Sequence, residues 1–275
     1  MRFHTPFLLS ALLFGASCGG VVPRSVAASA ETELGEAAAA QDEDRDLAER
    51  DEIRKSVELA PGAKVEVSGI NGSVTAETTA GSVAEVLVVR SARTRDALAH
   101  RRVFVETTGG MLRVRGEDEH GRTPDVRQRV VLKLPKSIEL TVTGVNGRVT
   151  VGELEGNVTV NGINGSVEVA HAMSTSDISG INGRVRIGLV RLAPDGLMIS
   201  GVNGKVELRF DEAVNADISV DGINGNVFTE SGGITVIGKM NPSSFRGRIG
   251  SGGPMIHVTG VNGNVELLGE GSSQQ

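Results

Sequence analysis

The side chains that most often carry out chemistry are few in this chain and are not grouped. The five histidines are His4, His100, His120, His171 and His257. None of them stands at metal-ligand spacing from another histidine or from a cysteine. The glycine-rich segments at 231–233 and 250–254 are not followed by the Lys-Ser or Lys-Thr pair of a phosphate-binding loop. We therefore expect no metal, no cofactor and no catalytic residue, and predict that the protein is not an enzyme.

Basic side chains recur at one position of a repeated sequence, which we describe below. Arg148, Arg184 and Lys205 each stand two residues after an asparagine of the repeat, and Arg248 takes part in a degenerate copy. If the repeats stack, these four residues form a stripe that suits polymers bearing phosphate or carboxylate groups. The alternative is a polar face that keeps the strands soluble and discourages edge-to-edge pairing.

Acidic side chains decide the enzymatic alternative, a β-helix enzyme acting on polysaccharides. Such an enzyme needs carboxylates clustered on one face for acid–base work. Here Glu168, Glu207 and Glu266 belong to different copies and alternate with basic residues, as on a solvated face. The chain also lacks Trp and Tyr, whose rings commonly stack on sugars. This function is therefore the third choice.

The only cysteine, Cys18, lies just after an apolar run at residues 7–14 that follows a basic residue, Arg2. The order Gly15-Ala16-Ser17-Cys18 resembles the lipobox of bacterial lipoproteins, although Gly15 replaces the usual leucine. The resemblance implies a signal peptide at 1–17 and lipidation of Cys18. The alternative is ordinary cleavage after Ala30, with residues 1–30 as the signal peptide of a secreted or periplasmic soluble protein. With no second cysteine, no disulfide is expected.

Residues 18–52 are rich in alanine and acidic side chains. Residues 31–52 hold ten acidic and two basic residues, a net charge of −8, whereas residues 53–275 are neutral overall. A segment of this composition buries too little apolar surface to order itself, so residues 18–52 are predicted to be a disordered tether. A neutral remainder gives no electrostatic footprint for nucleic acid.

Seven copies of Gly-[Ile/Val]-Asn-Gly-x-Val organise the rest of the chain. Their asparagines are Asn71, Asn146, Asn164, Asn182, Asn203, Asn224 and Asn262. From Gly144 the copies begin at intervals of 18, 18, 21, 21 and 38 residues, and the last interval contains the degenerate copy at 244–249. Apolar residues alternate with polar ones on both sides of each asparagine, which indicates a strand, a tight turn and a strand. Asparagine and glycine suit the turn because both tolerate positive φ.

Two all-β architectures fit this pattern. In a single-stranded β-helix or β-solenoid, each repeat is one coil of about 18–22 residues with Asn-Gly at its corner. In the alternative, Asn-Gly closes antiparallel hairpins that form a sandwich. We favour the solenoid, because the residue before each asparagine is always Ile or Val and a corner can turn it inward. The predicted parts are N-terminal coils with a capping elaboration (53–136), the repeat solenoid (137–268) and a flexible tail (269–275).

The segment Val65-x-Val67-x-Gly69-x-Asn71-Gly72-x-Val74, the charged insertion after it and the later Asn-Gly run resemble a known family. It is a bacterial β-strand-repeat family of unknown function whose members are labelled putative adhesins, related to the head GIN domain of putative adhesins. The resemblance covers about residues 53–268. It implies an exported β-helix-like domain on the cell envelope and carries no catalytic residues.

We therefore predict a non-catalytic envelope protein that binds a polymer or a partner, as an adhesin does. The alternative is a structural or regulatory envelope protein that stacks on another protein, or on a second copy, through its C-terminal coil. The protein is predicted to be exported, as a lipoprotein of the outer membrane or facing the periplasm, or at the cell surface; the alternative is a soluble secreted or periplasmic protein.

Overall fold

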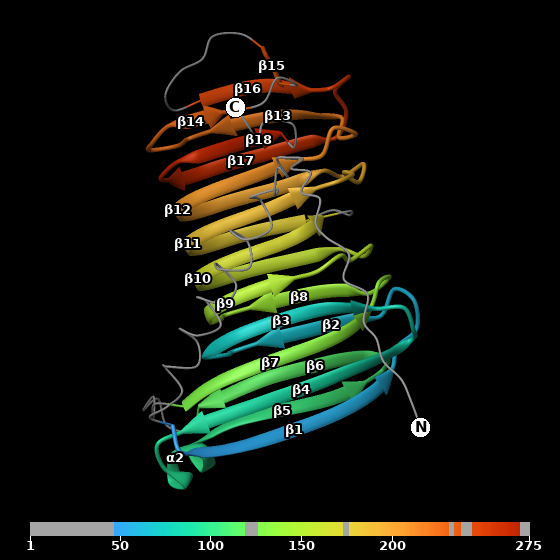
Figure 1. The fold of residues 1–275 in the computed structure, drawn as a ribbon, viewed down its shortest axis with the longest axis vertical. Helices are drawn as coiled ribbons and strands as arrows, with labels where there is room; N and C mark the ends of the chain where they lie inside the picture. The colour runs from blue at the N-terminus through green and yellow to red at the C-terminus, as the bar shows by residue number, and fades with distance from the viewer. Residues whose placement is uncertain (1–46, 119–125, 173–175, 231–233, 238–243, 270–275) are drawn as a thin grey trace, which may run out of the picture. The chain divides into compact units, whose positions relative to one another are not determined.

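A computed structural model of the chain describes residues 47–118, 126–172, 176–230, 234–237 and 244–269. These residues form one helix and eighteen strands that belong to one hydrogen-bonded sheet (Figure 1). The described part of the chain is therefore all-β, as the sequence predicts. The elements are β1 (Glu49–Glu58), β2 (Lys64–Ser68), β3 (Gly72–Thr79), β4 (Val83–Ala92), α2 (Arg95–His100), β5 (Arg101–Thr108), β6 (Met111–Asp118), β7 (Val126–Pro135), β8 (Glu139–Thr143), β9 (Asn146–Val151), β10 (Val158–Ala172), β11 (Ser176–Leu189), β12 (Leu197–Phe210), β13 (Ala216–Asp221), β14 (Val227–Thr229), β15 (Ile234–Val236), β16 (Ser244–Ile249), β17 (Met255–Asn262) and β18 (Val265–Gly269).

Strands β10, β11 and β12 each contain one complete Asn-Gly copy, and they pair in parallel. Val160 lies opposite Ile178, which in turn lies opposite Ile199 on β12. The repeated positions are thus in register from one copy to the next. Figure 1 shows these three strands side by side. Antiparallel hairpins closed by Asn-Gly are therefore a wrong prediction for these copies.

The order of the repeats in space differs from their order in the sequence. The β2/β3 repeat lies between β6/β7 and β8/β9, because both pairs of strands run parallel to it. At the other end, β17 and β18 lie between β12 and the β13/β14 repeat. The expectation of an open C-terminal coil is wrong, because this last repeat is paired along both edges. The stack ends instead with β14, β15 and β16.

The degenerate copy at 244–249 is also not a further parallel repeat. It forms β16, which runs antiparallel to β13 and to β15. The last long interval therefore holds an antiparallel return strand rather than a coil.

The core consists of aliphatic columns that follow from this register. The residue before each asparagine is only 1–5% exposed in all seven copies: Ile70, Val145, Ile163, Ile181, Val202, Ile223 and Val261. The residue three positions after the asparagine is buried as well in six of the copies, as with Val167 and Val185. Burying one Val or Ile side chain contributes about 1.5–3 kcal/mol, so stacking stabilises repeats that could not fold singly.

The two glycines of each copy have different roles. The first one makes the corner, as at Gly180 with φ +63°, a left-handed conformation that favours glycine. The second lies where neighbouring backbones approach closely, so that a Cβ at Gly183 would overlap the carbonyl oxygen of Gly165. The turn therefore depends on the glycine two residues before the asparagine, and the Asn-Gly pair itself is needed for close stacking.

An antiparallel elaboration forms the N-terminal end of the stack. Strand β4 pairs antiparallel with β1 and β7, and β5 pairs antiparallel with β6. The Arg90 guanidinium binds the Asp51 carboxylate and the carbonyl oxygens of Leu98 and Arg101, which joins α2 to this end. Strand β1 already begins at Glu49, so the segment predicted as a tether is ordered before residue 53. Alternating charged side chains along β1 explain why its composition resembled a tether.

Candidate functional site

The seven asparagines form one continuous ladder of side-chain amides. Each Nδ2 donates to the Oδ1 of the next asparagine at 3.0–3.1 Å, in the spatial order Asn224, Asn262, Asn203, Asn182, Asn164, Asn146 and Asn71. Asn71 ends the ladder by donating to the carbonyl oxygen of Val126 at 3.0 Å. The backbone N–H of Asn71 also donates to Oε1 of the buried Gln128. The turn asparagines predicted from the sequence are thus brought together and hold the corner edge of the stack.

Three of the four predicted stripe residues lie on one line beside the asparagine ladder. Arg148 lies opposite Ser166, which lies opposite Arg184, and Arg184 lies opposite Lys205. Arg129 on β7 extends the line beyond Ser73 at the other end. We call Arg129, Arg148, Arg184 and Lys205 the basic column. Arg129 was missed because the β7 strand lacks an Asn-Gly copy that would mark its register.

Arg248 does not belong to the basic column, because β16 is not a parallel repeat. It lies opposite Asp217 on β13 and forms an ion pair with it, with Nε 2.9 Å from Oδ1. The hydrogen bond from Arg248 lowers the pKa of Asp217, which keeps this pair charged. The charge of Arg248 is thus paired with Asp217 and does not extend the basic column.

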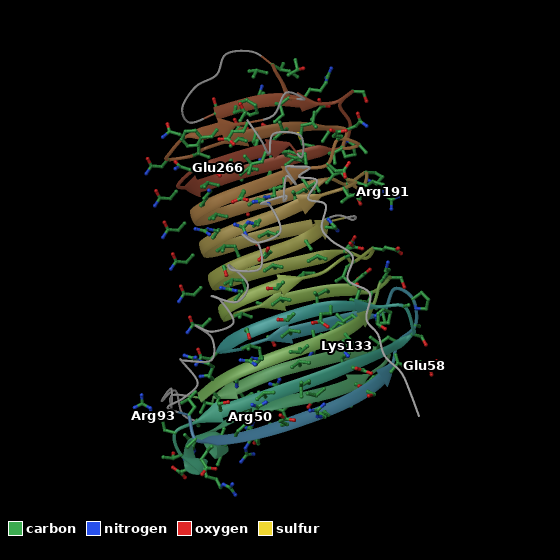
Figure 2. The ribbon with its side chains drawn as sticks, in the orientation of Figure 1. Arg50, Glu58, Arg93, Lys133, Arg191 and Glu266 are labelled. Atoms are coloured by element: carbon green, nitrogen blue, oxygen red, sulfur yellow. The ribbon has the colours of Figure 1, made fainter. Side chains whose placement is uncertain are left out.

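Acidic residues partly neutralise one end of the basic column. The Lys205 ammonium lies 2.6 Å from Glu266 and 3.8 Å from Glu207, whereas the side chains of Arg148 and Arg184 are exposed. Figure 2 shows Glu266 at the opposite edge of the strands from Arg191. The other three members of the basic column, Arg129 on β7, Arg148 on β9 and Arg184 on β11, are exposed at the surface.

A second line of charges alternates in sign next to the basic column. Arg186 lies between Glu168 at 3.7 Å and Glu207 at 3.2 Å, and Arg209 also binds Glu207 at 2.8 Å. Glu207 is only 4% exposed. Burial raises its pKa, but the hydrogen bond from Arg209 and the charges of Arg186, Arg209 and Lys205 outweigh burial, so the pKa is lowered. The predicted alternation of acids with bases on a solvated face is present, with Glu207 as a buried exception.

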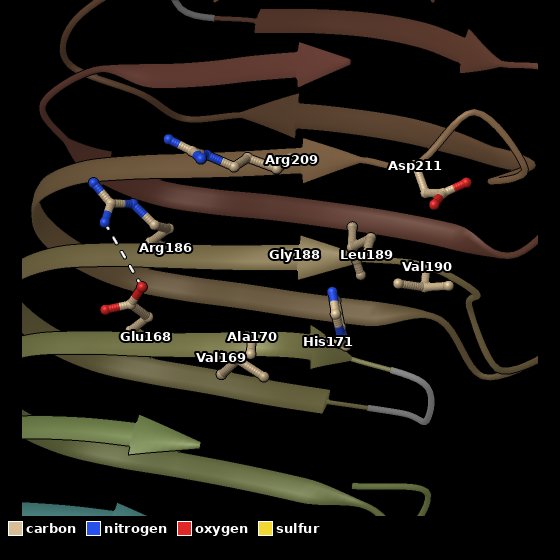
Figure 3. Close-up of a pocket in the computed structure, with 10 residues that line it drawn as sticks. All are labelled: Glu168, Val169, Ala170, His171, Arg186, Gly188, Leu189, Val190, Arg209 and Asp211. Atoms are coloured by element: carbon tan, nitrogen blue, oxygen red, sulfur yellow. Dashed lines mark ion pairs between the residues drawn. The ribbon is translucent and has the colours of Figure 1, made fainter. Parts of the chain in front are cut away.

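A hollow of about 180 Å³ lies at the far end of these strands, lined by Glu168, His171, Arg186, Gly188, Arg209 and Asp211 among others (Figure 3). Nδ1 of His171 lies 2.7 Å from Oε1 of Glu153. The arginines around the hollow are already paired with Glu168 and Glu207. Over the described ranges, no group of three or more His, Cys, Asp or Glu side chains is placed to hold a metal ion.

The opposite face carries an uncharged row that sequence reasoning missed. Hydroxyl and amide side chains lie in register across six repeats: Ser68, Thr143, Asn161, Ser179, Ser200 and Thr259. The signal was present three residues before six of the seven asparagines, with Asp221 at this position before Asn224. It is recognised only once the two strands of a repeat are known to present separate faces. The charged lines of the first face therefore contrast with an uncharged row on the second.

Cys18 lies outside the described residues, as do almost all of the predicted tether and the tail after Gly269. Among the residues that are described, none forms a helix with the length and apolar character needed to cross a membrane.

No protein-family model and no curated protein matches the chain. Several solved structures are similar to it. One is described as a putative cell adhesion protein from Clostridium sporogenes, with 12% identity, covering 80% of this chain and 100% of that chain at a TM-score of 0.44. A putative adhesin from Bacteroides fragilis is 10% identical and covers 79% of this chain and 97% of that chain, with a TM-score of 0.30. A putative lipid binding protein from Parabacteroides distasonis is 10% identical, covering 80% and 94%, with a TM-score of 0.23.

The chain is thus an all-β repeat protein. The first of these structures is described as a putative cell adhesion protein and the second as a putative adhesin, and the family that the Asn-Gly repeats resemble is also labelled putative adhesin.

Proposed function

We propose that the chain is a non-catalytic binding module of the bacterial cell envelope, of the adhesin type, whose repeats are coils of a β-solenoid. The observation that carries the proposal is the basic column, which sets Arg148, Arg184 and Lys205 in register along one edge of the stack. The ligand we propose is an extended anionic polymer of the envelope, bearing carboxylate or phosphate groups.

The spacing of the basic column suits such a ligand. Neighbouring strands lie about 4.8 Å apart, so the five steps from Arg129 to Lys205 extend over about 24 Å. A polymer lying along this line can contact several cations at once. Each exposed ion pair contributes little alone, whereas several linked contacts give useful affinity.

Export and anchoring are part of the same proposal. Lipidation of Cys18 would hold the module at the membrane, and residues before β1 would separate it from the lipid surface. Labelling cells with a fatty-acid analogue tests this. Label on the wild type that disappears in Cys18→Ser supports the anchor, and an unlabelled wild type contradicts it.

The binding test uses the full chain carrying Cys18→Ser, with polygalacturonate as the anionic probe and dextran as the neutral one. We expect binding to polygalacturonate that weakens as salt is raised, because salt screens exposed charges. The double variant Arg148→Glu/Arg184→Glu should bind about tenfold or more weakly, since each exposed pair contributes up to about 1 kcal/mol.

The matched control is Arg191→Glu/Arg246→Glu, which makes the same change in charge away from the basic column. Both residues are exposed. Unchanged binding by the control with a large loss in the Arg148/Arg184 variant supports the column. Equal losses in both variants, or no binding by the wild type, would contradict it.

A second candidate function is stacking on a partner protein or a second copy at the β14–β15 end. The observation that favours it is the exposure of Phe228 (46%), Val236 (44%) and Ile237 (46%) at this end of the stack. Analytical ultracentrifugation over a range of concentrations tests self-association. Oligomers that Phe228→Ser dissociates would favour this function, and a strict monomer would count against stacking of copies.

The polysaccharide-active enzyme stays the third candidate. Such an activity would be sought at the hollow lined by His171, whose ring contacts Glu153. Lyase and hydrolase assays with and without calcium should give no turnover, and turnover lost in His171→Ala would contradict the non-catalytic proposal.

A further inference from the structure

Asn-Gly is a dipeptide with its own chemistry. The backbone nitrogen of the glycine loses its proton and attacks Cγ of the asparagine, closing a succinimide ring and releasing ammonia. Water then opens the ring to give aspartate or isoaspartate, so the net change is the exchange of NH2 for OH. Glycine favours this reaction because it has no side chain to hinder the ring. The chain contains eight Asn-Gly dipeptides, the seven of the ladder and Asn161-Gly162.

In the middle of the ladder, hydrogen bonds fix the asparagine side-chain amide, and strand pairing fixes the backbone of the glycine whose nitrogen must attack it. The amide of Asn182 donates to Asn164 and accepts from Asn203, each at 3.1 Å. Gly183 lies inside β11, in register with Gly165 on one side and Gly204 on the other. The asparagine must leave two side-chain partners and the strand must open before the ring can close. We therefore expect such sites to react slowly.

The ladder end at Asn71 is also protected. Asn71 donates to the carbonyl oxygen of Val126 and accepts from Asn146, and Gly72 pairs with Gln128 inside β3. At this end, β6 and β7 provide one more layer of backbone beyond the last asparagine.

Asn224 differs from all of these sites. It donates to Asn262 at 3.1 Å, but over the described residues its own Oδ1 receives no side-chain donor, since the ladder stops there. The Asn224-Gly225 pair precedes β14, for which β18 is the only partner among the strands that the structure describes. Gly225 lies outside the strands and lacks the φ near +150° of the second glycine in the other copies. No backbone acceptor for its N–H is found in the part of the chain that the structure describes.

We propose that, among the seven Asn-Gly pairs of the ladder, Asn224-Gly225 is the one that deamidates first in the native protein. Both the nucleophile and the side-chain amide are freer there than in any other ladder copy. The product would remove the last hydrogen bond of the ladder, because a carboxylate has no hydrogen to donate to Asn262. An isoaspartate would also lengthen the backbone ahead of β14 and disturb its register with β18.

The test follows the full chain during prolonged incubation in mildly alkaline buffer, with peptide mapping by mass spectrometry. We expect Asn224 to convert about tenfold faster than Asn182, the factor expected when additional hydrogen bonds must open first. Conversion of Asn182 or Asn164 as fast as Asn224 would overturn the proposal.

Two controls separate structure from local sequence. In the chain unfolded by denaturant, Asn224 and Asn182 should convert at similar rates; a preference for Asn224 that persists there would also overturn the proposal. The variant Asn224→Gln keeps a side-chain amide but forms the larger ring slowly. It should lose the fast conversion while the other sites stay unchanged, and fast conversion appearing at another Asn-Gly would contradict the assignment.

Discussion

At the scale of single residues, we expect substitution of the stacked glycines to destabilise the fold more than substitution of the asparagines. Gly183 has no room for a Cβ beside the Gly165 carbonyl, whereas Gly62, with φ +76°, has no atom within 4 Å of that position. Both glycines have positive φ, so an alanine at either position would be conformationally strained. Only at Gly183 would it also overlap a neighbouring backbone. Comparing the two substitutions therefore distinguishes steric overlap from strain.

Gly183→Ala is therefore expected to destabilise the protein by about 3 kcal/mol, because the backbones of two repeats must move apart. Gly62→Ala should cost about 1 kcal/mol, the strain of a left-handed alanine alone. Urea unfolding measures both differences. Equal losses would mean that close stacking is not what requires the second glycine.

Glu207 is a buried carboxylate whose charge is held by Arg186, Arg209 and Lys205. Its pKa is lowered from 4.5 in the folded chain, so it binds protons more weakly folded than unfolded. The stabilisation is thus present at neutral pH and is lost as the pH falls below about 4.5 through the lower folded pKa.

We expect Glu207→Gln to be less stable at pH 7 by about 1–3 kcal/mol, the usual contribution of hydrogen bonds to a charged group. The difference from the wild type should shrink as the medium becomes more acidic. Thermal unfolding followed from neutral to acidic buffer checks this. A constant difference at every pH would show that shape, and not charge, makes Glu207 important.

At the scale of the elements, the asparagine ladder ties neighbouring strands together outside the sheet. A residue in its middle takes part in two side-chain hydrogen bonds, whereas Asn224 takes part in one. The ladder should therefore be weakened unequally by substitutions along it.

Asn182→Ala should destabilise by about 1–2 kcal/mol and Asn224→Ala by about half as much, since each exposed hydrogen bond contributes about 0.5–1 kcal/mol. The comparison is made by urea unfolding of both variants. A larger loss at Asn224 would contradict the view that the ladder sums pairwise contacts.

At the scale of the whole described domain, the position of β17 and β18 inside the stack predicts how truncation affects stability. These strands lie between β12 and the β13/β14 repeat, so they act as an internal layer although they come last in the sequence.

Ending the chain at residue 250 should therefore remove more than one repeat's share of stability, because β13, β14 and β16 lose the layer that joins them to β12. We expect a lower urea midpoint together with a lower m-value, since less surface is buried in the remaining fold. Ending the chain at residue 269 removes no described strand and serves as the control. A variant ending at 250 with the stability of the control would show that the last repeat is not internal.

The sequence by itself determined the class of the fold and the register. Regular alternation around each Asn-Gly predicted which residues face the core, and the constant Ile or Val before the asparagine favoured a corner that turns it inward over an antiparallel hairpin. The line formed by Arg148, Arg184 and Lys205 followed from the same periodicity, because residues at equal distances from equivalent asparagines stack when the pairing is in register.

Only the tertiary structure decided the order of the layers. The local pattern of a repeat is the same whichever neighbour it pairs with, so nothing near Asn262 reveals that β17 and β18 lie inside the stack. For the same reason the sequence did not reveal that Arg129 belongs to the basic column. Arg248 was assigned to the column wrongly, because an antiparallel strand shows the same alternation of apolar and polar residues as a parallel one. Strand periodicity specifies faces, whereas the choice of neighbour depends on contacts between residues far apart in the chain.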